Sequence, residues 1–201
     1  KNIRKIKSIE EFVNCRFCIV AGSTERKEDL LLAKAFKNLH HLAIKWIIVP
    51  HEKLPCALNR LRKLFGEETC FYSKDLNNNK KVLIYDITGD LFQLYQYADV
   101  CLVGRGFERA EIHNMLEPAV FLKPVLIGPK HKRFDEPKLF IKNKLAFEFN
   151  DEIQLTHLIQ KIFRKELEID CNAIQKIFED SSKGTAIIME SLNNSREKPP
   201  Y

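Results

Sequence analysis

The chain reads ADVCLVG over residues 98–104, HNMLEPA over 113–119 and KPVLIGP over 123–129. The first and last segments each carry a short apolar run typical of a buried strand, and the middle segment is polar and begins a helix. Ligands of open α/β sheets bind beyond the carboxyl ends of the strands. We therefore expect this stretch to form one wall of a ligand site between two strands.

The same alternation of apolar runs and helix-period segments extends over most of the chain. It predicts a doubly wound, Rossmann-like parallel α/β sheet with helices on both faces. Strands are expected at residues 17–21, 46–49, 82–85, 100–103, 125–127 and 146–149. Helices are expected from about residue 24 to residues 40–41, capped by Ser23 or Thr24, then at 54–64, closed by Gly66, and at 91–97.

The chain is expected to be a single domain over residues 1–201. Residues 1–14 form a polar, partly helical lead-in without an initiating Met, so we expect the chain to be a piece of a longer protein with a missing amino-terminal half. Three helix-like pieces at 151–165, 171–180 and 182–192 predict carboxyl-terminal helices packed on the sheet over 151–193, followed by a flexible tail at 194–201.

Composition narrows the function classes. No run approaches the eighteen or so apolar residues that span a bilayer, so a soluble chain is expected. The formal charge of +6 comes from lysines spread along the chain, with no basic stripe interleaved with aromatics, which argues against nucleic acid. The six cysteines do not form a disulfide framework and are expected to be reduced. Cys15 and Cys18 form one C-x-x-C without further ligands, so no metal site is predicted.

Polar residues follow the first two predicted strands. Gly22, Ser23 and Thr24 come directly after the first strand and open a helix, where backbone N–H groups favour a phosphate. A plain strand-to-helix turn with a Ser cap explains this segment equally well. His51 lies in Pro50-His51-Glu52 after the second strand and is a candidate hydrogen-bond donor, although an ordinary polar loop remains the alternative.

The loop after the fourth predicted strand carries further candidates. Gly104 lets the backbone approach a ligand closely, and Arg105 adds a guanidinium. Asn114 and Glu117, one helical turn apart, are expected to converge on one ligand, with His113 beside them. A carboxylate offers two acceptor oxygens for the vicinal hydroxyls of a ribose, whereas the alternative is a solvated acid at a helix start.

Taken together, these segments resemble the carboxyl-terminal half of the bacterial 3-deoxy-D-manno-octulosonic acid (Kdo) transferases, which are GT-B glycosyltransferases. The family pattern runs AGST, PRHPE, DTxGEL with LY and ADV, VGGS, GGHNxLEPA and GKPVLxGP. This chain matches it in the same order at residues 21–24, 50–52, 86–91, 94–95, 98–100, 103–104, 113–119 and 123–129. The last two blocks are the most specific.

The chain departs from the pattern at four places. The Arg between Pro50 and His51 is absent, and residues 86–90 permute the expected order. Arg105 replaces a Gly, and Glu111-Ile112 replaces the Gly-Gly before His113. These changes leave open whether donor choice is altered, although Arg105 itself adds a cation.

The resemblance implies a donor-binding domain that serves Kdo transfer from CMP-Kdo to lipid A precursor, in lipopolysaccharide biosynthesis at the cytoplasmic face of the inner membrane. It implies no bound metal or other cofactor at the donor. The acceptor, the membrane contact and the acidic catalytic base would belong to the missing half, so the fragment alone is expected to be inactive. Two alternatives remain: a GT-B glycosyltransferase or epimerase that uses a UDP-sugar, and a non-catalytic nucleotide-binding module.

Overall fold

The computed structural model describes residues 3–108, 112, 114–131, 135–167 and 169. Within them a seven-stranded sheet has the order β3-β4-β2-β1-β5-β6-β7, and every neighbouring pair is parallel. The predicted doubly wound α/β class is thus confirmed, and a short edge strand, β3, adds to the six predicted strands. The strands are β1 (Phe17–Thr24), β2 (Ile44–Pro50), β3 (Thr69–Phe71), β4 (Val82–Ile84), β5 (Val100–Val103), β6 (Val125–Ile127) and β7 (Ala146–Glu148).

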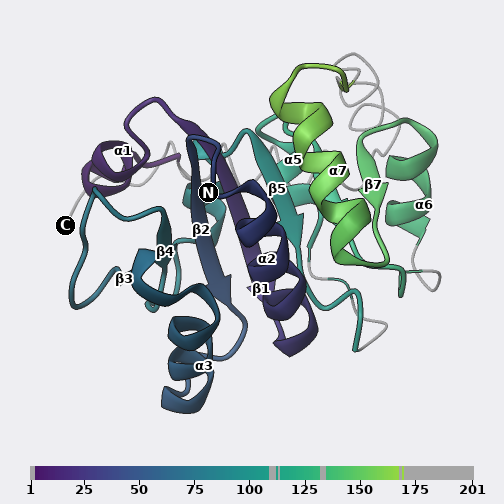
Figure 1. Cartoon of the computed structure of the whole chain (residues 1–201). Helices are drawn as coiled ribbons and strands as arrows, with labels where there is room; N and C mark the ends of the chain where they lie inside the picture. The colour runs from purple at the N-terminus through teal and green to yellow at the C-terminus, as the bar shows by residue number, and fades with distance from the viewer. Residues whose placement is uncertain (1–2, 109–111, 113, 132–134, 168, 170–201) are drawn as a thin grey trace.

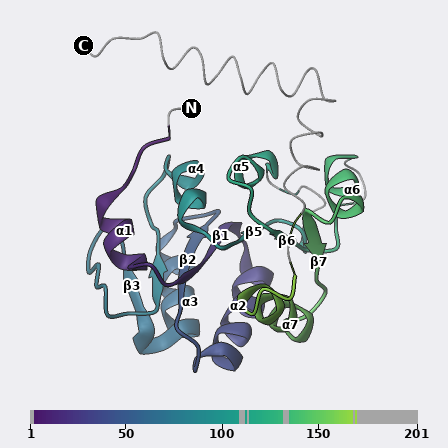
Figure 2. The same cartoon turned by 90° about the horizontal axis from the view of Figure 1, so that it is seen from above.

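Helices cover both faces of the sheet. Figure 2 shows α2, α3 and α7 on one face and α1, α4, α5 and α6 on the other. Two short 3-10 helices, η1 and η2, follow α3 and α4. The bounds of all these helices are α1 (Lys7–Val13), α2 (Arg26–Leu39), α3 (Pro55–Phe65), η1 (Gly66–Glu68), α4 (Leu91–Leu94), η2 (Tyr95–Tyr97), α5 (Leu116–Ala119), α6 (Asp135–Lys142) and α7 (Glu152–Phe163). No helix in the described part of the chain is both long and apolar enough to cross a membrane.

The core lies on both sides of the two central strands. Every residue of β2 is buried, as is all of β1 except Phe17, because a parallel sheet is covered on both faces. On the α2 and α3 face, Phe36 packs edge-on against Trp46 and Phe65, with ring centroids 5.9 and 5.6 Å apart. Burial of each such side chain contributes about 1.5–3 kcal/mol, so the face that carries α2 is firmly anchored.

The helix boundaries agree with the predictions except at the start of α2. Gly66 ends α3 with φ +65°, as expected, and the predicted helix at 91–97 forms as α4 followed by η2. The predicted caps of α2 are wrong, because β1 continues through Ser23 and Thr24 and the N-cap is Glu25. Thr24 stays in the strand because it pairs with Pro50 of β2.

The two ends of the chain are only partly described. The lead-in forms α1, whose Ile9, Phe12 and Val13 are buried against the sheet. The first predicted carboxyl-terminal piece forms α7, whose cap residue Asp151 accepts the backbone N–H of Gln154. The predicted pieces at 171–180 and 182–192 and the tail at 194–201 lie outside the described residues.

Candidate functional site

The switch point of the sheet lies between β1 and β5. From β1 the chain builds outward to β2 and β4 on one side, and from β5 it builds outward to β6 and β7 on the other. In open α/β sheets, ligands bind beyond the carboxyl ends of the strands at such a point. We call the place where the loops leave β1 and β5 the crevice. The arrows of β1 and β2 in Figure 1 point to the end of the sheet at which α3 lies. We call this end the carboxyl edge and the opposite end the amino edge.

Two residues at the crevice have left-handed backbones although they are not glycines. Ser23 has φ +54° at a break in the β1–β2 register, and Arg105 has φ +68° two residues after β5. Such conformations cost about 1–3 kcal/mol each and cluster at ligand sites. Both residues were predicted as donor-binding, and the structure brings them to the same crevice.

Three loops meet there at glycines. The N–H of Gly104 donates to the carbonyl of Gly22 at 2.9 Å, and a Cβ on Gly104 would lie 2.2 Å from the carbonyl oxygen of Ser23. A Cβ on Gly106 would lie 2.8 Å from the backbone nitrogen of Gly128, which follows β6. Gly22 and Gly104 were predicted site residues. Gly106 and Gly128 were not, although their position after strands was a usable signal.

The side chain of Tyr95 packs directly against Gly22. A Cβ on Gly22 would lie 2.1 Å from the hydroxyl oxygen of Tyr95. Burial raises the pKa of this fully buried hydroxyl well above its ordinary value, and the charges of Cys101 and Glu117 raise it further. Helix α5, which carries Glu117, packs against η2, which carries Tyr95, so Glu117 belongs to an element next to the one that contacts Gly22.

The first turn of α2 satisfies its own backbone donors. Glu25 and Glu28 form a reciprocal capping box, in which the N–H of Glu25 donates to Glu28 Oε2 at 3.1 Å. Glu28 Oε1 also accepts the N–H of Gly106 at 3.1 Å, which ties α2 to the loop after β5. Glu28 is 1% exposed, and burial raises its pKa. The sequence left a phosphate site and a plain capped turn equally open at this helix start, and the structure shows that two carboxylates cap it.

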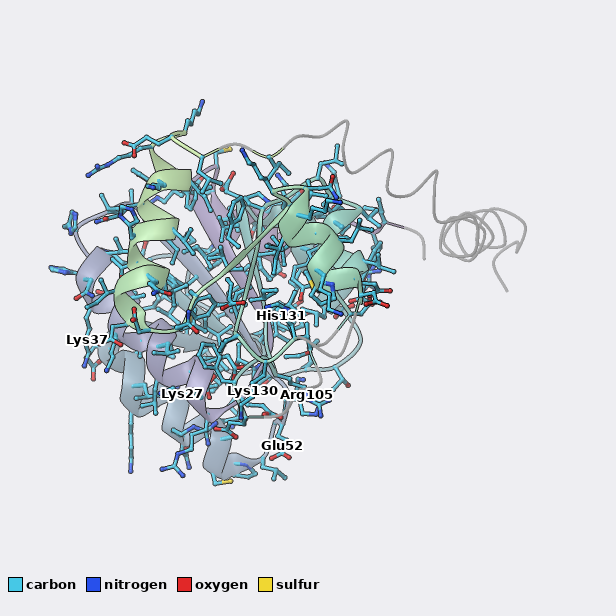
Figure 3. All side chains as sticks on the ribbon, turned by 90° about the vertical axis from the view of Figure 1, so that its right-hand side faces the viewer. Lys27, Lys37, Glu52, Arg105, Lys130 and His131 are labelled. Carbon is cyan, nitrogen blue, oxygen red and sulfur yellow. The ribbon has the colours of Figure 1, made fainter. Side chains whose placement is uncertain are left out.

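Arg105 lies against the same helix start. Its Nε is 3.5 Å from Glu25 Oε1, and both side chains are mostly buried. Figure 3 shows Arg105 and Lys130 at the same end of the molecule as Glu52. The N–H of Lys130 donates to the carbonyl of Gly106, so the loop after β6 joins this group. The guanidinium predicted from the sequence is thus present at the carboxyl edge, with Glu25 as its partner.

Asn114 and Glu117 lie differently from the sequence expectation. Asn114 is exposed and precedes α5, and its Oδ1 accepts the N–H of Leu116 at 2.9 Å. The predicted common helix face of Asn114 and Glu117 is therefore wrong, because α5 begins only at Leu116. Glu117 is half-buried in the first turn of α5. His113 and Glu111 lie outside the described residues.

His51 lies at the edge predicted for it. Its backbone N–H donates to the carbonyl of Thr24 at 2.9 Å, so the loops after β1 and β2 run together. The side chain is exposed. Its role as a donor to a ligand stays a prediction.

A cavity of ≈ 210 Å³ opens at the carboxyl edge between the starts of α2 and α3. Thr24, Glu25, Arg26, Glu52, Arg60 and Glu108 line it. Arg60 was not a candidate from the sequence, because a charged residue in an amphipathic helix pattern predicts a solvated face. Two larger hollows are also present. One of ≈ 370 Å³ lies at the amino edge beside Arg16 and Lys123, and one of ≈ 490 Å³ lies along α3, where it shares Cys56 and Arg60 with the cavity.

The C-x-x-C pair does not converge. Cys15 is exposed, whereas Cys18 is buried in β1, and burial raises the pKa of its thiol well above the ordinary value. Among the described residues, no group of three or more His, Cys, Asp and Glu side chains is arranged to hold a metal ion.

Curated proteins align with most of this chain. A 3-deoxy-D-manno-octulosonic acid transferase of Aquifex aeolicus is 30% identical over 158 residues, which are 76% of this chain and 44% of that protein. A transferase of the same name from Haemophilus influenzae is 29% identical and covers 69% of this chain and 33% of its own. A bifunctional glycosyltransferase/methyltransferase of Fusobacterium nucleatum is 30% identical over 78% of this chain and 25% of that protein. The chain thus spans less than half the length of these relatives.

Solved structures share the fold. The carboxyl-terminal CMP-Kdo binding domain of WaaA from Acinetobacter baumannii superposes with a TM-score of 0.73 at 20% identity, over 84% of this chain and 92% of that one. A glycosyltransferase from Rickettsia africae superposes with a TM-score of 0.64 at 16% identity, over 96% of this chain and 52% of that one. No protein-family model matches the chain. The chain is therefore related by sequence to the Kdo transferases, as its motifs predict, and it has the fold of the carboxyl-terminal domain of a GT-B glycosyltransferase.

Proposed function

We propose that this chain is the donor-binding domain of a Kdo transferase and binds CMP-Kdo at its carboxyl edge. The observation that carries the proposal is the convergence of left-handed Ser23 and Arg105 with closely packed Gly22 and Gly104 at the switch point. Helix α5, which carries the acid Glu117, packs against η2 beside them. The names of the aligned relatives, two of them Kdo transferases, support this donor over other nucleotide sugars.

In the proposed binding mode, the nucleotide lies over the crevice between β1 and β5. The half-buried carboxylate of Glu117 accepts hydrogen bonds from the ribose hydroxyls, since one carboxylate can accept two. Arg105, with backbone N–H groups of the loops after β1 and β5, faces the phosphate, and such preorganised cationic groups stabilise the charge of a departing CMP. Asn114, His51 and His113 are proposed to add polar contacts. The capped start of α2 makes it a poorer phosphate site than Arg105.

The proposal assigns the rest of the reaction to protein outside these 201 residues. That part would hold the lipid A precursor and the catalytic base, and it would work at the cytoplasmic face of the inner membrane. The chain alone would then bind the donor without transferring Kdo.

Calorimetry with CMP tests the ribose assignment. We expect Glu117→Gln to weaken CMP binding by about 10- to 100-fold, because a hydrogen bond to a charged group is worth about 1.5–3 kcal/mol. Glu136→Gln is the matched control, because Glu136 is an exposed acid in the first turn of α6. Equal affinities in the wild type and Glu117→Gln would refute the role of Glu117.

A panel of nucleotides tests the donor. We expect CMP to raise the melting temperature of the chain, whereas UMP, UDP and GDP have little effect. Solved proteins of the same fold are described as complexes with UDP-glucose and UDP-GlcNAc, at 14% and 13% identity to this chain. Stabilisation by UDP alone would replace the proposed donor with a UDP-sugar, and stabilisation by no nucleotide would overturn the proposal.

A further inference from the structure

One carboxylate of the chain is buried in an unusual place. Asp29 lies in the first turn of α2 and is 0% exposed. A fully buried carboxylate is rare unless it is paired, because its desolvation costs several kcal/mol. Burial raises the pKa of Asp29, and its hydrogen bond from Arg60 opposes that increase. The chain thus places a costly charge directly behind the cavity at the carboxyl edge.

The partner of Asp29 reaches that cavity. Arg60 Nη2 of α3 donates to Asp29 Oδ2 at 2.8 Å. The Arg60 side chain is 32% exposed and lines the ≈ 210 Å³ cavity together with Thr24. A guanidinium has five donors, so a single bond to Asp29 restrains the group and leaves other donors for a ligand.

A contribution to stability does not by itself account for the buried pair of Asp29 and Arg60. A buried ion pair adds little net stability over apolar side chains of similar volume. The α2–α3 contact already has Phe36 and Phe65 packed edge-on. A preorganised cation at the mouth of a cavity is instead what recognition of a planar anion requires.

The other charges of the cavity define the ligand. Glu25 is balanced by Arg105, and Arg26 adds a second, exposed cation to the lining. Glu52 and Glu108 are exposed to solvent, whose high dielectric constant weakens their repulsion of an anion. These carboxylates accept hydrogen bonds from hydroxyl groups. The lining therefore suits a polyhydroxylated molecule that carries one acidic group, and a sugar acid has this chemistry.

We propose that Arg60, held in place by Asp29, binds the carboxylate of the sugar acid on the donor. This inference rests on the proposed donor-binding function, since the sugar of CMP-Kdo is an octulosonic acid. Thr24 links the two sites, because it lines the cavity and directly follows Ser23 at the crevice. Arg60 is then a binding residue that determines the choice of sugar, and Asp29 is a positioning residue that acts through Arg60.

Calorimetry on the 201-residue chain, with CMP and CMP-Kdo as separate titrants, tests the inference. We expect Arg60→Met to weaken CMP-Kdo by about 10- to 100-fold and to leave CMP unchanged, because CMP lacks the acid. The CMP-Kdo affinity of Arg60→Lys should fall between those of the wild type and Arg60→Met, since lysine keeps the charge without the planar fork. Asp29→Asn should lower the preference for CMP-Kdo over CMP, whereas a merely structural residue would weaken both equally.

The same helix supplies a matched control. Arg62 Nη2 is also 2.8 Å from a carboxylate, Asp75 Oδ2, but Arg62 does not line the cavity. Arg62→Met should leave both affinities unchanged. If the wild type binds both titrants and Arg60→Met keeps their affinity ratio, the inference fails while the proposed function stands. If the wild type binds neither titrant, both fail. If Arg60→Met does not fold, the ratio in Arg60→Lys decides, and a wild-type ratio there overturns the inference.

Discussion

A buried lysine at the amino edge of the sheet holds loops together, whereas a buried carboxylate at the carboxyl edge holds an arginine that borders a cavity. At the amino edge, Lys45 is 1% exposed and its Nζ donates to the carbonyls of Asn78 and Lys80, at 2.6 and 2.5 Å. At the carboxyl edge, Asp29 is as deeply buried, but its partner Arg60 faces the cavity. The first arrangement is complete within the chain, and the second leaves donors for another molecule.

The backbone shows the same contrast. Asn14, Leu122, Lys144 and Lys165 have positive φ values just after the ends of helices, where a left-handed residue satisfies the last carbonyls. For example, the backbone N–H of Lys144 donates to the carbonyl of Ile141, and the next residue closes the turn at the end of α6. Ser23 and Arg105 are left-handed at the ends of strands instead. Helix termination therefore explains the strain at the amino edge and does not explain it at the crevice.

Gly104→Ala, at the carboxyl edge, should cause the largest loss of stability. Its Cβ would lie 2.2 Å from the carbonyl oxygen of Ser23, and this backbone cannot move without breaking the bond between Gly104 and Gly22. We expect the free energy of unfolding in urea to fall by about 3 kcal/mol or more. Gly89→Ala is the comparison, because nothing lies within 4 Å of its added Cβ and only its φ of +104° is strained. Equal losses in the two variants would argue against close packing at the crevice.

Lys45→Met tests the amino edge. The variant keeps the length of the side chain but leaves two carbonyls without their donor. We expect the free energy of unfolding to fall by about 2 kcal/mol. Calorimetry should show unchanged CMP affinity, because this edge is proposed to be structural only. Weaker CMP binding by a folded Lys45→Met would erase the distinction between the edges.

The sequence predicts the sheet better than it predicts the site. Continuous apolar runs identify six strands, because strands buried on both faces need them. Strand β3 escapes because its Thr-Cys-Phe follows Gly66-Glu67-Glu68 and contains no aliphatic run, and α6 escapes because Pro137 interrupts its pattern. Residues Asp29 and Arg60 escape because they pair between helices brought together only by the folded chain. Glycines after strands and a family motif can be read from neighbouring residues in the sequence. A buried ion pair cannot, because its two residues are far apart in the chain.

The pH dependence of stability separates the two edges further. Burial raises the pKa of Glu28 above 4.5, so the folded chain keeps this proton to higher pH than the unfolded chain does. The free energy of unfolding should therefore fall as pH rises from 4.5 through the folded pKa and level off above it. The total fall is about 1.4 kcal/mol for each pH unit that separates the folded pKa from the unfolded pKa.

Urea unfolding between pH 4 and 7 measures this slope against Glu28→Gln, which should lose the contribution of Glu28. Burial also raises the pKa of Asp29, and this residue remains in both proteins. Lys45 does not interfere, because burial lowers its pKa from 10.5 and its effect falls at alkaline pH. An identical slope in both proteins would show that Glu28 is not the group responsible.

The smallest expected effect is a difference in CMP affinity between Ser23→Gly and Lys144→Gly. Glycine removes about 1–2 kcal/mol of left-handed strain and adds about 0.5–1 kcal/mol of unfolded-state entropy, so each variant should gain roughly 0.5 kcal/mol. The two substitutions should therefore change stability equally but at opposite edges of the sheet, since Ser23 lies at the carboxyl edge and Lys144 follows α6 at the amino edge. If strain at Ser23 fixes the crevice for the donor, only Ser23→Gly should weaken CMP in calorimetry, by about threefold. Unchanged CMP affinity in both variants would mean that the conformation of Ser23 serves the bulge in β1 and not the ligand.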